Sequence, residues 1–387
     1  MGTDDTRLRV LHLDHTSASG GAELALLRML QAEPDWAPMV LTPPTGGGGV
    51  FDFLHGHRTG GVSQRAGVAS GRIGAVFTGT AGLVAQALST RLHRAFRTAE
   101  LVDANSTRAA AYGAMAARMR RVPFVIHLRD TVDVATLGAA GHTVMARVAL
   151  PRADAVIANS AATLATAAPH LRADALSAVI PSASGLRVGL PRPARNEGPL
   201  RVGMLARIDP WKGQHLVLEA FARAFPQGEE TLEFAGGAPF GHDEYAASLA
   251  RAAEQWGLGD RVRMRGDIRD IWPVLAQWDI AVQFSTRPEP LGQNVLQYLA
   301  AGCATVVADE GGPIEWVMDG VNGARATARD VDDLARVLRA LAADPDLRAQ
   351  YGGAGAATAG LLDDAAVASA HAAFYREVRI AFLSRTP

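Results

Sequence analysis

Two cationic residues near the middle of the chain have the type and spacing of a phosphate-binding element. Residues 203–213 read GMLARIDPWKG, a pattern typical of a strand, a polar turn and the start of a helix. Arg207 lies at the end of the expected strand, and Lys212 lies near the helix N-terminus, where the helix dipole also favours an anion. We therefore expect a clamp for a diphosphate. The alternative is two basic residues on a surface loop.

Lys212 is the only lysine in the chain; every other basic residue counted among the 38 lysines and arginines is an arginine. This bias indicates a high-GC coding sequence, which makes a bacterial origin plausible. A lysine kept against such a bias indicates a site where a compact ammonium is needed and a planar guanidinium is not equivalent. The alternative is that one lysine remains by chance.

A second stretch, residues 285–323, combines a carboxylate with glycine turns. Glu289 is expected at the end of a strand, just before Leu291 and Gly292, whose backbone amides open a helix. A carboxylate beside such amides can hold sugar hydroxyls and a phosphate together. The later glycines, Gly302 and the Gly311–Gly312 pair, suit tight turns, which also bring the backbone close to a ligand.

The elements that must position these residues alternate along the chain. Short apolar runs are expected as strands at 8–13, 37–42, 101–104, 124–127 and 155–158, and again at 200–205, 231–235, 262–264, 280–284 and 305–308. Helical patterns intervene, among them 24–31, 73–97, 214–224 and 294–301. Buried strands alternating with helices predict an α/β fold with parallel sheets covered on both faces. Two such doubly wound domains would place a ligand cleft at the carboxyl ends of their strands.

The order of these motifs closely resembles the retaining glycosyltransferases of family 4, which have the GT-B fold of two Rossmann-like domains facing each other across a cleft. The resemblance covers most of the C-terminal half, through Arg207 with Lys212–Gly213, Glu289 with Gly292, the run 301–307 and the turn Gly311–Gly312 with Glu315. The N-terminal half agrees more loosely, in GGAE at 20–23, VPFVIHLRD with His127 and Asp130, and RADAVIANSAAT at 152–163.

The resemblance implies a role for each matching residue. Arg207 and Lys212 would bind the donor diphosphate, and Glu289 would accept hydrogen bonds from donor-sugar hydroxyls. Leu291 and Gly292 would offer backbone amides, while Gly20 and Gly21 would approach the phosphates from the other domain. His127 would lie beside the sugar or the incoming acceptor; the alternative for this residue is a core or surface histidine. No obligatory metal and no cofactor are implied.

The alternation of strands and helices breaks at residues 181–199, which are rich in Pro, Gly and Arg, and this break indicates a domain plan. It predicts an acceptor-side domain at 1–185, a Pro- and Gly-rich linker at 186–199, a nucleotide-sugar domain at 200–365 and a helix at 366–387 that packs back on the N-terminal domain. One position departs from the family pattern: the second carboxylate of its Glu-x7-Glu pair is here Gln297. We expect Gln297 to contact the donor ribose less strongly than a carboxylate would; the alternative is that it lies on the outer face of its helix.

The expected activity is retaining transfer of a hexosyl or N-acetylhexosaminyl group from a nucleotide-diphosphate sugar to a hydroxyl of a glycan, lipid or small natural product. A nucleotide-sugar 2-epimerase of the same fold is one alternative, and a catalytically silent binding homologue is another. The presence of Arg207, Lys212 and Glu289 favours the transferase. The replacement of the family's second carboxylate by Gln297 leaves the catalytically silent homologue as an alternative.

Composition sets further limits. The net charge of -1 shows no global basic excess of the kind that drives sequence-independent nucleic-acid binding. A single cysteine, Cys303, excludes an intramolecular disulfide and is expected to be buried.

No signal-peptide pattern is seen at the N-terminus, so a cytoplasmic location is expected. The basic amphipathic stretch 88–97 could dock on an anionic membrane, although a solvated helix face is the favoured interpretation. Asp344 is expected to cap a helix.

Overall fold

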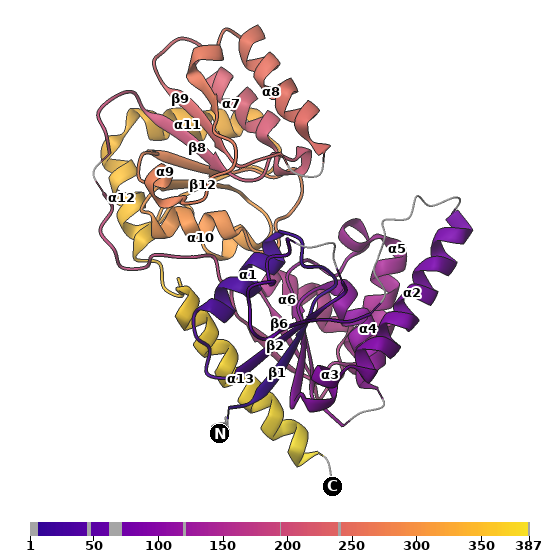
Figure 1. Ribbon diagram of the computed structural model, residues 1–387. Coiled ribbons are helices and arrows are strands. Elements are labelled where there is room, and N and C mark those ends of the chain that lie inside the picture. Colours follow the sequence, from indigo (N-terminus) through magenta and orange to yellow (C-terminus); the bar gives the residue numbers. More distant parts are fainter. Residues whose placement is uncertain are drawn as a thin grey trace. The chain divides into compact units, whose positions relative to one another are not determined.

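A computed structural model describes residues 7–44, 48–61, 72–118, 121–193, 195–238 and 241–385, with the side chains of 72–80 excluded. The chain divides into two compact units (Figure 1). Unit 1 comprises Met1–Ala183 together with Asp364–Pro387, and unit 2 comprises Ser184–Asp363.

Unit 1 is built on a seven-stranded parallel sheet in the order β3-β2-β1-β4-β5-β6-β7. The strands are β1 (Arg9–Leu13), β2 (Ala37–Thr42), β3 (His57–Thr59), β4 (Leu101–Ala104), β5 (Phe124–Leu128), β6 (Ala155–Ala158) and β7 (Leu176–Val179). The main helices are α1 (Gly21–Gln31), α2 (Arg72–Leu92), α3 (Arg94–Thr98), α4 (Thr107–Ala117), α5 (Val134–Val144), α6 (Ala161–Ala167) and α13 (Asp364–Ser384). Strand order reverses between β1 and β4, so the carboxyl ends of these two strands open onto a crevice.

The helices of unit 1 begin where side chains can satisfy free backbone amides. Ser106 accepts from the amide of Ala109 at the start of α4, and Ser160 accepts from Thr163 at the start of α6. The single helix predicted over 73–97 is interrupted at His93, whose ring accepts from the amide of Ala95 and caps α3. The prediction of one continuous helix was therefore wrong at this point.

Unit 2 has a six-stranded parallel sheet in the order β10-β9-β8-β11-β12-β13. The strands are β8 (Arg201–Leu205), β9 (Thr231–Ala235), β10 (Val262–Met264), β11 (Ile280–Gln283), β12 (Ala304–Ala308) and β13 (Ala324–Ala326). The helices are α7 (Gln214–Ala224), α8 (Asp243–Gln255), α9 (Trp272–Leu275), α10 (Gln293–Ala300), α11 (Val331–Ala343) and α12 (Pro345–Ala356). The order reverses between β8 and β11, and the loops that carry Arg207, Lys212 and Glu289 follow these two strands.

Both units are Rossmann-like, as the alternation of strands and helices predicts, and their central strands are buried because helices cover both faces of each sheet. Cys303 is fully buried, and burial raises the pKa of its thiol to about 11. Asp344 caps α12 by accepting from the amide of Leu347. These two predictions are confirmed. Among the described residues, no helix is both long and apolar enough to cross a bilayer.

Candidate functional site

The two motifs of unit 2 meet through an ion pair. Lys212 Nζ lies 2.6 Å from Glu289 Oε1, and the two side chains are 18% and 6% exposed. Ser285 Oγ donates to the same carboxylate oxygen at 2.7 Å. The loops that carry these residues follow β8 and β11, the strands between which the sheet order reverses. Carboxyl ends at such a point are where ligands bind in open α/β sheets.

The loop after β8 is shaped by its own residues. Asp209 accepts from the amide of Trp211 and begins a short 3-10 turn, Pro210–Lys212. Gly213 follows with a φ of 81°, and a Cβ there would lie 2.1 Å from the carbonyl oxygen of Phe284. Only glycine therefore lets this loop approach the end of β11 closely. The amide of Thr286 donates to Trp211 O at 2.8 Å and joins the two loops.

Trp211 organises the cations of the site. Lys212 Nζ lies 3.9 Å from the centroid of its ring, and the guanidinium carbons of Arg287 and Arg207 lie 4.4 and 5.8 Å away. Arg207 Nε also lies 3.3 Å from Asp209 Oδ2. Three cationic side chains thus lie near the indole ring of Trp211, where cation–π attraction stabilises them. Trp211 and Arg287 were missed from the sequence, although both lie inside the two quoted stretches.

The backbone of Glu289 is held by the glycine turn that follows β12. The amide of Gly312 donates to Glu289 O at 2.8 Å. A Cβ at Gly311 would lie 2.6 Å from the same oxygen, so a side chain there would push the two segments apart. The expectation that Glu289 ends a strand was wrong: β11 ends at Gln283, and Glu289 lies in the loop beyond it.

Leu291 and Gly292 lie at the start of α10. The Leu291 side chain is buried in an apolar cluster with Val295 and Leu299, which anchors this end of the helix. Gly292 is the N-cap, with φ 76° and ψ 63°. The role assigned to their backbone amides stays a prediction, and the placement of the helix N-terminus beside Glu289 is consistent with it.

Gln297 is buried on α10. Its amide nitrogen donates to Ser184 O at 2.8 Å, which ties the helix to the first residue of unit 2. The alternative that Gln297 lies on the outer face of its helix is therefore wrong. The ribose contact stays a prediction; the bond to Ser184 uses one of the two amide hydrogens of Gln297 and leaves its amide oxygen to accept from a hydroxyl.

Gln297→Glu is expected to destabilise unit 2 by about 1–3 kcal/mol, because a carboxylate cannot donate to Ser184 O and would face a second acceptor. Urea unfolding at pH 8 measures the loss. The difference from the parent protein should shrink at pH 5, where a protonated carboxyl regains a donor. Gln297→Met removes the donor without adding charge and serves as the matched control. Equal stability of the parent and Gln297→Glu at pH 8 would contradict the role of this bond.

Unit 1 has a polar cluster at its own reversal point. Asp14 follows β1, and its Oδ2 accepts from Asn105 Nδ2, which follows β4, at 2.6 Å. Asn105 Oδ1 in turn accepts from Arg129 Nε and Nη2 at 2.9 and 2.7 Å. Arg129 follows β5 and also donates to Ser182 Oγ at 2.9 Å. Sequence reasoning missed this cluster. Its only signal was that each member directly follows an apolar run.

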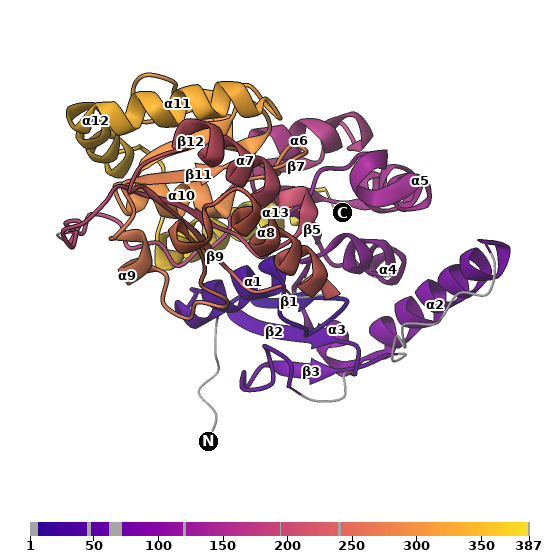
Figure 2. The ribbon, with the colours of Figure 1, turned by 90° about the horizontal axis from the view of Figure 1, so that it is seen from above.

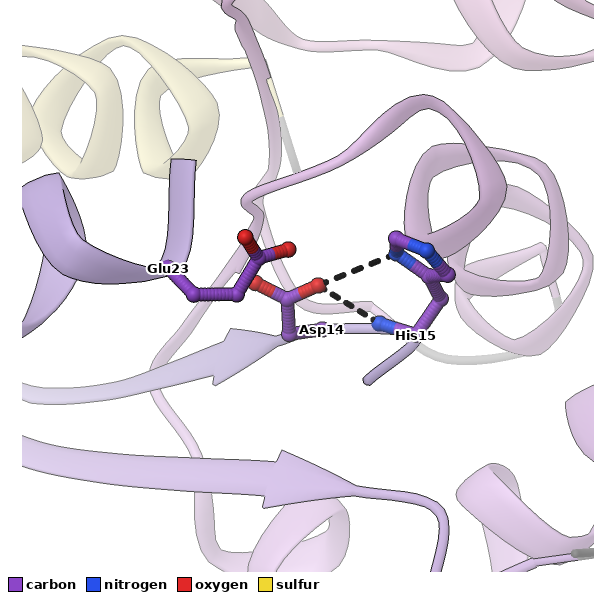
Figure 3. Close-up of side chains that lie close together, drawn as sticks. All are labelled: Asp14, His15 and Glu23. Carbon is purple, nitrogen blue, oxygen red and sulfur yellow. Dashed lines mark hydrogen bonds and ion pairs between the residues drawn. The ribbon is translucent and has the colours of Figure 1, made fainter. Parts of the chain in front are cut away.

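Glu23 extends this cluster from α1. Figure 3 shows its carboxylate beside that of Asp14, with His15 on the other side of Asp14. Burial, reinforced by the negative charge of Asp14, raises the pKa of Glu23 to about 7. A Cβ at Gly20 would lie 2.3 Å from Glu23 Oε2, whereas a Cβ at Gly21 would meet nothing within 4 Å. Gly20 therefore makes room for this carboxylate, and Gly21 is the more open of the two glycines predicted to approach the phosphates.

Asp14, His15 and Glu23 have ligand atoms within 4.8 Å of one another, which is compatible with a cation. Asp14 is already hydrogen-bonded at both oxygens, since Oδ1 accepts from the His15 amide and from Ser106 Oγ. Arg129 supplies positive charge to the same carboxylates. These interactions account for the cluster, so we assign no metal here. The absence of an obligatory metal stays a prediction.

His127 lies on β5, and its side chain is only 1% exposed. Its ring centroid is 5.1 Å from that of His371 on α13. Burial lowers the pKa of His127 well below its usual value, so the ring is neutral at pH 7. This placement corresponds to the core histidine weighed as the alternative from the sequence. In this conformation a substrate could reach the exposed Asp130 but not the His127 ring; the role predicted for His127 is untested.

Sequence comparison identifies relatives for part of the chain. Residues 191–358, which lie within unit 2, match the family model described as Glycosyl transferases group 1. The lipopolysaccharide core biosynthesis glycosyltransferase LpsE of Rhizobium meliloti is 34% identical over 137 residues, which are 35% of this chain. A D-inositol 3-phosphate glycosyltransferase of Kribbella flavida is 32% identical over 164 residues, 40% of this chain. Each match spans 38% of the relative's length.

Structural comparison extends the similarity to both units. The crystal structure of HepE from Anabaena, in complex with UDP and glucose, has a TM-score of 0.77 and 26% identity. It covers 96% of this chain and 100% of the HepE chain. The prediction of two Rossmann-like α/β domains of the GT-B fold is confirmed. The Lys212–Glu289 pair, Arg207 and the Trp211 cations all lie inside the region that matches the group 1 family model.

Proposed function

We propose that this chain is a retaining glycosyltransferase that moves a sugar from a nucleotide-diphosphate sugar to an acceptor hydroxyl. The observation that carries the proposal is the partly buried Lys212–Glu289 ion pair beside Trp211, at the reversal point of the unit 2 sheet. The group 1 match over the same residues supports it.

The residues suggest a division of work within unit 2. Lys212 and Arg207, with Arg287 beside them, would offset the charge of the departing diphosphate, which is the usual electrostatic contribution of such a site. Glu289 Oε1 is occupied by Lys212 and Ser285, so sugar hydroxyls would donate to Oε2. A carboxylate can accept at both oxygens, which makes this double use possible.

The experiment is a two-stage assay on the full chain. A thermal-shift screen with UDP, GDP, ADP and dTDP identifies the nucleotide, because a specific ligand stabilises the protein by mass action. UDP is tested first, since it is the nucleotide bound to HepE. Donors of the selected nucleotide are then offered with inositol phosphate and a lipopolysaccharide core acceptor, which the names of the relatives suggest, and with small alcohols.

The outcomes separate the alternatives. Transfer to an acceptor supports a transferase, whereas interconversion of two donor sugars without acceptor identifies a 2-epimerase. Nucleotide binding without either reaction identifies a silent binding homologue. The proposal would be contradicted if none of the four nucleotides stabilised the protein.

The product is expected to keep the anomeric configuration of the donor sugar. This expectation rests on the resemblance to the family 4 enzymes, since no residue of unit 2 is placed as an in-line base. Proton NMR of the fresh product, recorded before mutarotation, reads the configuration from the coupling constant of the anomeric proton. An inverted product would contradict the family 4 assignment while leaving the transferase proposal intact.

A further inference from the structure

Helix α2 has three large apolar side chains that are exposed among the described residues. Val84, Leu88 and Leu92 are 51%, 56% and 74% exposed and recur every four residues, so they form one stripe along the helix. The opposite face is buried, yet it carries Gln86 and Thr90, which are 2% and 0% exposed. In a solvated helix the pattern is the reverse, with the large apolar residues turned inward.

The buried face has a reason of its own. Gln86 Nε2 donates to Gly60 O at 3.2 Å and thereby attaches α2 to the segment that follows β3. Leu83 packs beside it on the core of unit 1, and α2 also packs against α4. Figures 1 and 2 both show α2 projecting from the sheet of unit 1. The rotation of α2 is therefore set by these contacts, and the Leu88 stripe is left outward.

The charged residues of α2 and α3 themselves are all of one sign. Between residues 72 and 99 the chain has four arginines and no aspartate or glutamate. Three of them, Arg91, Arg94 and Arg97, lie on the last turn of α2 and on α3, and Arg94 and Arg97 are exposed. An exposed apolar stripe that ends in basic residues matches a surface with an apolar interior and anionic headgroups.

We propose that α2 and α3 form a docking surface for an anionic lipid bilayer. The stripe of Val84, Leu88 and Leu92 would insert below the lipid headgroups, and the arginines would lie among the headgroups. The surface would hold the protein peripherally. A second copy of the chain is a poorer occupant, because pairing this face with itself brings together two basic surfaces that contain no acidic residue over 72–99. The proposal goes beyond the transferase activity and does not depend on it.

Vesicle co-sedimentation of the full chain tests the docking surface. The parent protein should partition into phosphatidylcholine vesicles that contain about one third phosphatidylglycerol and only weakly into pure phosphatidylcholine. The double variant Leu88→Ser/Leu92→Ser should partition into the anionic vesicles about tenfold less than the parent protein, or less still. Arg94→Gln/Arg97→Gln should lose about tenfold on anionic vesicles and change little on neutral ones.

The matched control is Met318→Ser/Val321→Ser in unit 2. These two side chains are 54% and 50% exposed but flank the acidic Asp319, so the control should partition as the parent protein does. Circular dichroism checks that all variants fold. The proposal is overturned if the parent protein does not distinguish the two vesicle types, or if the Leu88/Leu92 variant partitions normally. It is also overturned if light scattering shows a dimer that this variant abolishes, since a second copy would then cover the stripe.

Discussion

Lys212→Ala is expected to lower kcat/KM for sugar transfer about 30-fold or more. Lys212 Nζ lies 2.6 Å from Glu289 Oε1 and 3.9 Å from the centroid of the Trp211 ring, so the ammonium is held by a carboxylate and by the indole. Removing the ammonium leaves the buried Glu289 carboxylate without its partner, and the loss of one member of such a charge pair costs roughly 2–5 kcal/mol. Steady-state kinetics with the identified donor measure the loss.

Two comparisons separate catalysis from folding. Arg251→Ala also removes one cation from unit 2, but Arg251 is exposed and pairs with Glu244 away from the site, so its activity should equal that of the parent protein. Lys212→Arg keeps the charge but not the compact ammonium, and it should also impair transfer. Activity of Lys212→Ala within about threefold of the parent protein would remove Lys212 from the proposed site.

Acid is expected to destabilise unit 1, because its core holds two neutral histidine rings. His371 on α13 and His127 on β5 are both buried and lie side by side. The neighbouring carboxylate of Asp103 accepts from Tyr375 Oη at 2.8 Å and from His12 Nδ1 at 3.1 Å. These contacts attach α13 to β1, β4 and β5, so a change in their charge affects the packing of the whole helix.

The direction follows from the pKa values. Burial lowers the pKa of His371 from 6.5 to about 4 and that of His127 well below 6.5. Below pH 6.5 the unfolded chain therefore binds protons that the folded chain does not, and the free energy of unfolding falls as the pH falls. For His371 the loss begins near pH 6.5 and levels off near pH 4. It amounts to on the order of 3 kcal/mol, since one pKa unit corresponds to about 1.4 kcal/mol.

Urea unfolding between pH 7.5 and 4.5 measures this dependence. His371→Gln should flatten the curve, and His127→Gln together with His371→Gln should flatten it further. His55→Gln is the matched control, because His55 is an exposed histidine of the same unit and should leave the curve unchanged. A parent protein whose stability is constant between pH 6.5 and 4.5, or a His371→Gln variant with the parent curve, would contradict the assignment.

Features that depend on neighbouring residues in the chain could be predicted from the sequence. Helix α7 was predicted with its observed bounds, and the apolar runs were assigned correctly to the central strands of both sheets. Arg207, Lys212 and Glu289 were singled out because their spacing around expected strand ends is itself local information. By contrast, β13, β3 and β7 were missed, and the last two show why. They are short and partly exposed, and pairing with a neighbouring strand defines them more than composition does.

The sequence by itself determined the order of the elements and the chemistry of the residues at the strand ends, because periodicity and residue type act within a few residues. Only the tertiary structure decided which of these residues meet. Arg129 reaches Asn105, and Gln297 reaches Ser184, across separations in the chain that no local pattern records. The burial of the His127 ring and the outward stripe of α2 likewise depend on helices that pack from elsewhere in unit 1. These features arise from close packing, in which side chains that are far apart in the sequence fill the same interior space.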